Sequence, residues 1–259
     1  MHESNLTVIT PTGDRPLPFS LCASFMARQT IKPHRWIIVD DGVAGDAVLP
    51  YSFAATCIDA PIVKRKRTSD EPQHTLALNM KLALSRVTTD CVVIMEDDDW
   101  YSPRYLETML ALMPGDPMGI VGQDHTYYYR IQDRMWCKAS VPSHMRASLC
   151  ATGFRAGVIP VLDKICDNSI RDNTWFLDLA LWQQARTRCF TRDTVCVGIK
   201  QLPGRRGLTS GWSTTGHGWE HDYSMHRLTE LVGKHDALVY SNTLNKEGTN
   251  AKTWERLPI

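Results

Sequence analysis

Apolar runs that end in polar clusters recur along the first 115 residues of this chain. A short β-rich run at 6–10 and apolar runs at 36–39 and 91–95 alternate with segments of helical apolar spacing at 18–29, 73–87 and 105–113. Uninterrupted apolar runs of this length are typical of strands buried on both faces, as in the middle of a parallel sheet. With weaker strand candidates at 57–58 and 62–63, the pattern predicts an α/β fold with a doubly wound, mostly parallel sheet flanked by helices.

The second half is less regular. We expect an edge strand at 119–121, a β-hairpin from 126–131 and 134–138, and a strand region at 189–199, while the apolar segments 151–154 and 158–159 flank Gly157. Helices are predicted at 174–185, with Trp175, Leu179 and Trp182 on one stripe, and at 223–233, before a polar tail. A glycine-rich loop at 203–218 is long for a structureless connection, which is typical of lids or disordered segments.

Acids follow two of the predicted strands. Glu96, Asp97, Asp98 and Asp99 come directly after the run at 91–95, and Asp40 with Asp41 follows the run at 36–39. Because the carboxyl ends of parallel strands meet at the edge where ligands bind, we expect both clusters to lie together. Four adjacent carboxylates repel one another unless a cation neutralises them.

A hard divalent ion such as Mg²⁺ or Mn²⁺ takes oxygen ligands of this kind, often together with substrate phosphates. This interpretation is favoured over its alternative, an acidic turn that caps the next helix, with Ser102 or Asp99 as the N-cap and Pro103 in the first turn. The basic run 64–67 is either a solvated loop or faces phosphates, and Arg67 is the residue assigned to that contact.

Composition narrows the class of protein. The chain has 259 residues, 43% of them hydrophobic, and 29 basic residues against 28 acidic ones, so it is not a general polyanion binder. The dinucleotide fingerprint and the P-loop are both missing from the sequence. Eight cysteines without a Cys-x-x-Cys pair, no signal peptide and no membrane-length apolar run lead us to expect a reduced, cytoplasmic protein.

Three segments resemble the family 2 glycosyltransferases of the GT-A fold. They are Val-Ile-Thr-Pro-Thr at 8–12, Gln-Thr at 29–30 with Trp-Ile-Ile-Val-Asp-Asp-Gly at 36–42, and Val-Ile-Met-Glu-Asp-Asp-Asp-Trp-Tyr at 93–101. Phe-Leu-Asp-Leu-Ala-Leu-Trp at 176–182 is a weaker match to the acidic segment before the family's last core helix. The resemblance implies one GT-A-like domain, with a nucleotide-sugar-binding half at 1–115 and an irregular acceptor-binding half at 116–259.

The resemblance also implies site residues. It implies a nucleotide-sugar donor, typically with uridine as the nucleoside, and Mn²⁺ or Mg²⁺. Glu96 stands where the family usually has Asp, in an Asp-x-Asp-Asp pattern. The residues implied for donor binding are Thr10, Pro11, Arg15, Asp40, Glu96 and Asp97. Those implied for the metal are Asp98 as the chief ligand, Asp99 and His217, with Asp97 as a close alternative to Asp98.

Sugar transfer passes through an oxocarbenium-like transition state while negative charge grows on the leaving diphosphate. A divalent ion stabilises that charge, and a carboxylate must take the proton of the acceptor hydroxyl. Asp178 matches the family's general base, with Asp172 as the next candidate, and direct attack would invert the anomeric configuration. The alternatives are an ordinary strand end for Asp40, an exposed helix position for Asp178 and an ordinary loop histidine for His217.

Aromatic residues and the acceptor complete the expectations. Trp100, Trp212 and Trp219 are candidates for stacking on a sugar or base, whereas Trp175 and Trp182 are assigned to the core. The acceptor is a hydroxyl of a glycan, a small molecule, a protein or a modified base in DNA, the last suggested by the basic runs and by the aromatic run 127–130. A nucleotidyltransferase and a non-catalytic nucleotide-sugar-binding module are the rival functions.

Overall fold

A seven-stranded sheet forms the centre of the computed structural model, which describes residues 5–50, 53, 58–72, 74–139, 146–174, 177–205 and 218–244. Its strands in spatial order are β10 (Thr187–Thr191), β6 (Gly119–Gln123), β9 (Thr152–Arg155), β4 (Cys91–Ile94), β1 (Leu6–Thr12), β2 (Arg35–Asp40) and β3 (Ile62–Lys64). The strands from β4 to β3 are parallel, and β9 runs antiparallel to both of its neighbours. The predicted mostly parallel sheet is therefore confirmed.

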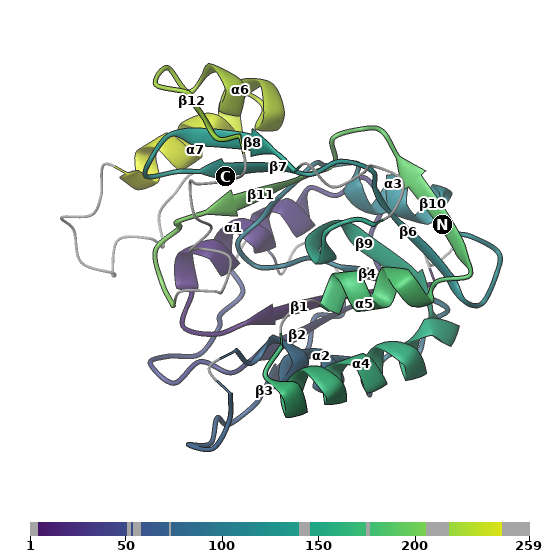
Figure 1. Cartoon of the computed structure of the whole chain (residues 1–259). Helices are drawn as coiled ribbons and strands as arrows, with labels where there is room; N and C mark the ends of the chain where they lie inside the picture. The colour runs from purple at the N-terminus through teal and green to yellow at the C-terminus, as the bar shows by residue number, and fades with distance from the viewer. Residues whose placement is uncertain are drawn as a thin grey trace.

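Both faces of this sheet are covered, which explains the continuous apolar runs of its central strands. Helices α2 (Leu76–Leu84), α4 (Ile159–Asp172) and α5 (Leu177–Gln184) pack on one face, as Figure 1 shows. Helices α1 (Pro16–Ala27) and α3 (Tyr105–Ala111) belong to the core on the other face. All seven residues of β1 and all four of β4 are buried, as expected for strands between two helical layers.

A second sheet has the order β12 (Glu220–His221), β8 (Met135–Lys138), β7 (Tyr127–Arg130), β11 (Cys196–Lys200) and β5 (Trp100–Tyr101). It shares a hydrophobic core with α1, α3, α6 (His226–Val232) and α7 (Lys234–Leu244). Strand β5 begins directly after the acidic run, so the run is a turn between the two sheets. The acidic turn is therefore held by β4 of the central sheet on one side and by β5 of the second sheet on the other.

Several predicted elements are confirmed, and others are wrong. The order β1-α1-β2-β3-α2-β4-α3 and the β7–β8 hairpin match the sequence pattern. The strand at 119–121, predicted at an edge, is interior, because β10 returns to pair beside it.

Helix α4 was not predicted, and helix α7 occupies part of the expected polar tail. In α5 the buried face carries Leu177, Leu181 and Trp182, while Leu179 is 40% exposed, so the predicted stripe through Leu179 is wrong. The missed helix α4 had a signal: Leu162, Cys166 and Ser169 recur at helical spacing and are its buried residues.

Among the described residues, no helix combines the length and the apolar character that crossing a membrane requires. Two 3₁₀ turns, η2 (Leu149–Ala151) and η3 (Ala156–Val158), flank β9. The first of them is important for the site, because it places Cys150 beside the acidic turn.

Candidate active site

The site lies where the connections of the central sheet change direction. From β1 the chain proceeds to β2 and β3 on one side, and then returns to β4 on the other side of β1. In open α/β sheets this arrangement leaves a crevice at the carboxyl ends of the two strands, which is the usual place for a ligand. Residues after β1 and the acidic turn after β4 meet at this point.

Asp97 and Asp98 form the outer pair of the acidic turn and face the end of β1. Thr12 donates a hydrogen bond from Oγ1 to Asp97 Oδ2 at 2.7 Å. Arg15 spans both acids, with Nη1 2.6 Å from Asp97 Oδ1 and Nη2 2.5 Å from Asp98 Oδ2. The Asp98 side chain is 14% exposed and that of Asp97 only 2%, so Asp98 is the more accessible carboxylate.

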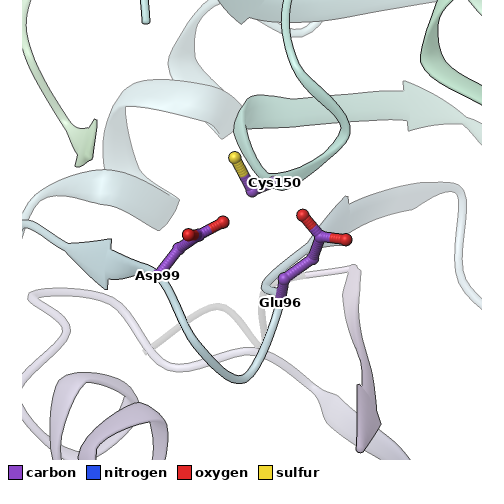
Figure 2. Close-up of side chains that lie close together, drawn as sticks. All are labelled: Glu96, Asp99 and Cys150. Carbon is purple, nitrogen blue, oxygen red and sulfur yellow. The ribbon is translucent and has the colours of Figure 1, made fainter. Parts of the chain in front are cut away.

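Glu96 and Asp99 form the inner pair and have different contact partners. Their carboxylates and the Cys150 sulfur lie within 4.8 Å of one another, as Figure 2 shows. Asp99 Oδ1 accepts hydrogen bonds from the backbone N–H of Ile199 at 2.9 Å and from Lys200 Nζ at 3.2 Å. The four consecutive acids are therefore divided between two environments.

Electrostatics in the turn are those of crowded, buried carboxylates. Burial and the charges of Asp98 and Asp99 raise the pKa of Asp97 to about 6, despite Arg15. Burial and Asp99 raise the pKa of Glu96 well above its usual value. Burial also acts on Asp98, but Arg15 and Lys200 outweigh it and lower the pKa of that carboxyl.

The charge balance of the turn fits a divalent cation. Four carboxylates face two basic side chains, Arg15 and Lys200, so full ionisation leaves two negative charges. Oxygen donors with an excess charge of this size suit Mg²⁺ or Mn²⁺. Asp98 is the carboxylate that such an ion could reach most readily from the outer side.

The acids after β2 have different partners. Asp40 accepts hydrogen bonds from the backbone N–H groups of Gly42 at 2.8 Å and Ala47 at 2.7 Å, and pairs with Lys64 Nζ at 3.0 Å. Its side chain is 1% exposed. In the structure Asp40 therefore holds the loop after β2, and its contact with a nucleoside stays a prediction.

Asp41 is fully buried between two arginines. Arg65 Nη2 lies 2.9 Å and Arg205 Nη2 2.7 Å from its carboxylate, which also accepts a hydrogen bond from Thr75. Burial raises the pKa of Asp41, but Thr75, Arg205 and Arg65 outweigh it and lower the pKa. Gly13 is required here, since a Cβ at this position would lie 2.1 Å from Asp41 Oδ1.

The remaining residues predicted to bind the donor lie in two places, in β1 and after β3. Thr10 and Pro11 are buried in β1, and Thr10 Oγ1 accepts a hydrogen bond from Trp36 Nε1 at 2.8 Å. Arg67 is half-buried, three residues beyond the end of β3. The neighbouring Lys64 and Arg65 are engaged with acids of this chain, Lys64 with Asp40 and Asp46 and Arg65 with Asp41 and Glu71.

Asp178 lies in the first turn of α5, with its side chain 21% exposed. Its Oδ2 accepts a hydrogen bond from Arg146 Nη1 at 3.1 Å. Burial raises the pKa of Asp178, against the opposing charge of Arg146. Asp172, the alternative base, is at the end of α4, about half exposed and paired with its neighbour Arg171.

The aromatic predictions have mixed outcomes. Trp100 is wrong as a stacking residue, because it is 5% exposed and its Nε1 donates to Asp236 Oδ2 at 2.6 Å. Trp182 is confirmed as a core residue, 1% exposed and stacked on Phe190. Trp219 lies under Arg130, whose guanidinium carbon is 5.6 Å from the ring centroid. His217, Trp212 and Trp175 lie outside the described residues.

Tyr128 and Tyr129 are buried, so the aromatic run on β7 offers little face for stacking on nucleic acid.

Sequence reasoning missed four residues that the fold brings to the site. Lys200 and Cys150 come from segments 50 residues or more away from the acidic turn and carry no local motif. Arg146, which precedes η2, likewise belongs to no local sequence motif. Thr12 had a signal, since it ends the first matching segment, immediately before the predicted turn.

Comparisons with known proteins concern the family and the fold of this chain. The sequence matches the family description "Glycosyl transferase family 2" over residues 7–176. No curated protein sequence matches the chain.

Among solved structures, the chain is similar to TarS of S. aureus, with a TM-score of 0.52 and 14% identity over 75% of this chain and 36% of that one. It is also similar to the mannosyltransferase PcManGT of Pyrobaculum calidifontis, with a TM-score of 0.51 and 16% identity over 76% of this chain and 57% of that one. The chain thus spans little more than half the length of PcManGT, and about a third of TarS. The similarity shows a shared GT-A fold, and the match over residues 7–176 shows that the chain belongs to glycosyl transferase family 2.

Proposed function

We propose that this protein is a metal-dependent glycosyltransferase that moves a sugar from a nucleotide-sugar to an acceptor hydroxyl. The observation that carries the proposal is the contact of Arg15 with Asp97 and Asp98 at the switch point of the sheet. There a basic side chain and an excess of carboxylates meet, as the recognition of a metal-bound diphosphate requires. Residues 1–115 supply this donor side, and residues 116–259 supply the acceptor side.

Asp98 is the chief ligand that we assign to the divalent ion, with Asp99 and His217 as further ligands. PcManGT has been solved in complex with GDP-Man and Mn²⁺. A bound divalent ion supplies Lewis-acid stabilisation of the leaving diphosphate. Asp98 is suited to this role because it is ionised at neutral pH, with its pKa lowered by Arg15 and Lys200 despite burial.

Arg15 orients the donor. Its guanidinium is planar and presents several donors in fixed directions, a geometry that suits phosphate oxygens as well as carboxylates. Asp40, at the end of β2, and Thr10, two residues before the end of the neighbouring β1, border the place that we assign to the nucleoside, and uridine is our first choice. Arg67 and Glu96 complete the proposed donor contacts.

Asp178 is the proposed general base. It would accept the proton of the acceptor hydroxyl as that oxygen attacks the anomeric carbon, so the configuration inverts. Arg146 holds the carboxylate from one side through Oδ2 and opposes the rise of its pKa on burial. A carboxylate of raised pKa is a better base than an ordinary exposed one.

The binding half of the proposal is tested by thermal shift with a panel of nucleotide-sugars, each with and without Mn²⁺. A ligand that binds only the folded chain raises the melting temperature. We expect one nucleotide-sugar to stabilise the protein in the presence of Mn²⁺ and to lose this effect in EDTA. Stabilisation by nucleoside triphosphates alone would favour a nucleotidyltransferase, and binding without donor hydrolysis or transfer would favour a non-catalytic module.

The chemical half is tested with Asp178→Asn. We expect turnover, measured as donor hydrolysis or transfer, to fall about 10²–10⁴-fold with donor affinity unchanged. Asp172→Asn is the matched control, because Asp172 is also a helical acid paired with an arginine but is about half exposed. Wild-type turnover in Asp178→Asn together with a large loss in Asp172→Asn would reverse the assignment.

A further inference from the structure

Asp14 lies between the end of β1 and Arg15, and its backbone conformation is uncommon. Its φ is 56°, in the left-handed region, which few residues other than glycine adopt, although Asp and Asn are enriched there. The next residue, Arg15, is the N-cap of α1, and its side chain reaches Asp97 and Asp98. The conformation of Asp14 therefore sets the direction in which the chain leaves β1 and presents Arg15 to the acidic turn.

The carboxylate of Asp14 is bound to the loop after β2. Asp14 Oδ1 accepts hydrogen bonds from the backbone N–H groups of Val43 at 2.9 Å and Ala44 at 2.7 Å, and Oδ2 accepts from Val43 at 3.1 Å. Hydrogen bonds to an ionised acceptor are stronger than those between neutral groups. This loop follows Asp40, which borders the place assigned to the nucleoside, so Asp14 holds the loop against the turn that carries Arg15.

The backbone of Asp14 is bound to a third segment, which follows β11. The Asp14 carbonyl oxygen accepts a hydrogen bond from the backbone N–H of Arg205 at 3.0 Å. Gly204 lies so close that a Cβ there would be 3.0 Å from this oxygen and 3.1 Å from Arg15 Cα, and its φ of 116° also favours glycine. The side chain of Arg205 in turn pairs with Asp41. Asp14 thus joins, through separate atoms, segments that are far apart in the sequence.

Given the proposed glycosyltransferase function, we propose that Asp14 is a positioning residue for the nucleotide-sugar, because it joins the segments 12–15, 42–47 and 203–205 around the place of the donor. Its carboxylate holds the loop that borders the nucleoside, and its left-handed backbone directs Arg15 towards the diphosphate. A pre-organised site loses less conformational freedom when its ligand binds, so these contacts raise donor affinity. A residue that only stabilised the fold would change unfolding and leave donor affinity as it is.

Three variants separate the backbone of Asp14 from its carboxylate. Asp14→Asn keeps the left-handed tendency and one acceptor oxygen, Asp14→Gly keeps only the backbone freedom, and Asp14→Ala loses both. In the free protein, hydrogen exchange of the Val43 and Ala44 amides should accelerate at least about tenfold in Asp14→Gly and Asp14→Ala, because each amide loses a charged acceptor. The acceleration should be smaller in Asp14→Asn. The Arg205 amide, which is bound by the backbone, should respond more to Asp14→Ala than to Asp14→Gly.

Donor binding is measured in the same variants as the Kd from thermal shift and as the KM for the nucleotide-sugar. Both should rise at least about tenfold in Asp14→Ala, less in Asp14→Gly and least in Asp14→Asn, with kcat at saturating donor nearly unchanged. Asn173→Ala is the matched control, because Asn173 also has a left-handed backbone, with a φ of 49°, but ends α4. It should lower the melting temperature and leave donor affinity and the exchange of the Val43 amide unchanged.

Three results would overturn the assignment of Asp14: wild-type exchange at Val43 and Ala44 in Asp14→Ala, unchanged donor affinity in all three variants, or an equal loss of donor affinity in Asn173→Ala. The comparison of Asp14→Gly with Asp14→Asn decides the same points even if Asp14→Ala does not fold. A wild type that binds no nucleotide-sugar would instead overturn the proposed function. Exchange in the free protein would then still show whether Asp14 holds the loop after β2, so the two failures are distinguishable.

Discussion

Acids follow two strands of the central sheet, β2 and β4, and the two groups of acids have different surroundings. After β2, Asp40 and Asp41 are enclosed by backbone N–H groups and by the basic side chains of Lys64, Arg65 and Arg205. After β4, four acids face only two basic residues, Arg15 and Lys200. The first cluster is neutralised by the chain itself, whereas the second has charge left for a ligand.

This difference separates acids that build the site from acids that can react with a ligand. The carboxylate of Asp41 has a lowered pKa because its partners outweigh its burial, while burial and neighbouring carboxylates raise the pKa of Asp97 to about 6. A set of raised pKa values in one crevice is typical of functional sites. Similar sequence patterns, an apolar run followed by acids, therefore lead to a structural cluster in one case and to a candidate metal site in the other.

The largest expected effect comes from removing the buried cation behind the inner pair. Lys200 is 5% exposed, and its partner Asp99 is fully buried. Lys200→Met leaves that carboxylate without its counter-charge, so we expect a loss of about 3–5 kcal/mol of unfolding free energy. Chemical denaturation measures it, and the double variant Lys200→Met/Asp99→Asn should recover part of the loss. A loss below about 1 kcal/mol would mean that the second cluster does not depend on its internal cation.

The next largest effect is a loss of donor turnover, which we expect from an acid after β4. Asp98→Asn should lower Mn²⁺-dependent donor turnover about 10²-fold, because an electrostatic partner of the leaving group is lost. Folding should be nearly unaffected, since Asp98 is the more accessible member of the outer pair. Asp90→Asn is the control, because Asp90 immediately precedes β4, at the opposite end of that strand from the acidic turn. Equal turnover in both variants would contradict the metal assignment.

A pH series sharpens the comparison. The pKa of Asp97 is about 6, above the value of about 3.9 in an unfolded chain, so the metal-free protein should become more stable as the pH falls from 7 towards 4. The pKa of Asp41 is lowered, so its contribution is present above about pH 4 and is lost on further acidification. Denaturation in EDTA at each pH measures both trends. Asp97→Asn should flatten the pH dependence of the unfolding free energy between pH 7 and 4, and Asp41→Asn should flatten it below about pH 4. Unchanged pH dependence in both variants would refute the contrast between the two acids.

The smallest effect is expected at the exposed side of the first cluster. Lys64 pairs with Asp40 but is itself 42% exposed. Lys64→Met should cost less than about 1 kcal/mol of unfolding free energy, because solvent screens an exposed ion pair. In the same denaturation series, the difference between the losses in Lys64→Met and Lys200→Met shows how burial changes the contribution of a lysine–aspartate pair to the free energy of unfolding. A loss as large as that of Lys200→Met would remove the difference.

Much of the donor side was predictable because its strands and acids are contiguous in the sequence. The buried strands β1, β2 and β4 appear as apolar runs, and the acids stand directly at two of their ends. Parallel pairing then brings the carboxyl ends together, since Thr12 lies opposite Asp40 in the register of β1 and β2. The family resemblance covered the same segments.

The acceptor side was harder because its pairings are not local. Strand β6 was expected at an edge, yet β10, more than 60 residues later, pairs beside it. The sequence predicts a polar tail where helix α7 lies, but Ala237 and Tyr240 of this helix are buried. The position of Trp100 after the acids predicts a stacking residue, but the turn directs its side chain into the core towards Asp236.

By itself the sequence determined the order of strands and helices in the first half, the family and the position of the acids at strand ends, because periodicity and strand direction are local properties. Only the tertiary structure divided the four acids into an outer pair with Arg15 and an inner pair with Lys200 and Cys150. Which cation or thiol meets which carboxylate depends on contacts between segments far apart in the chain, and no local pattern encodes them.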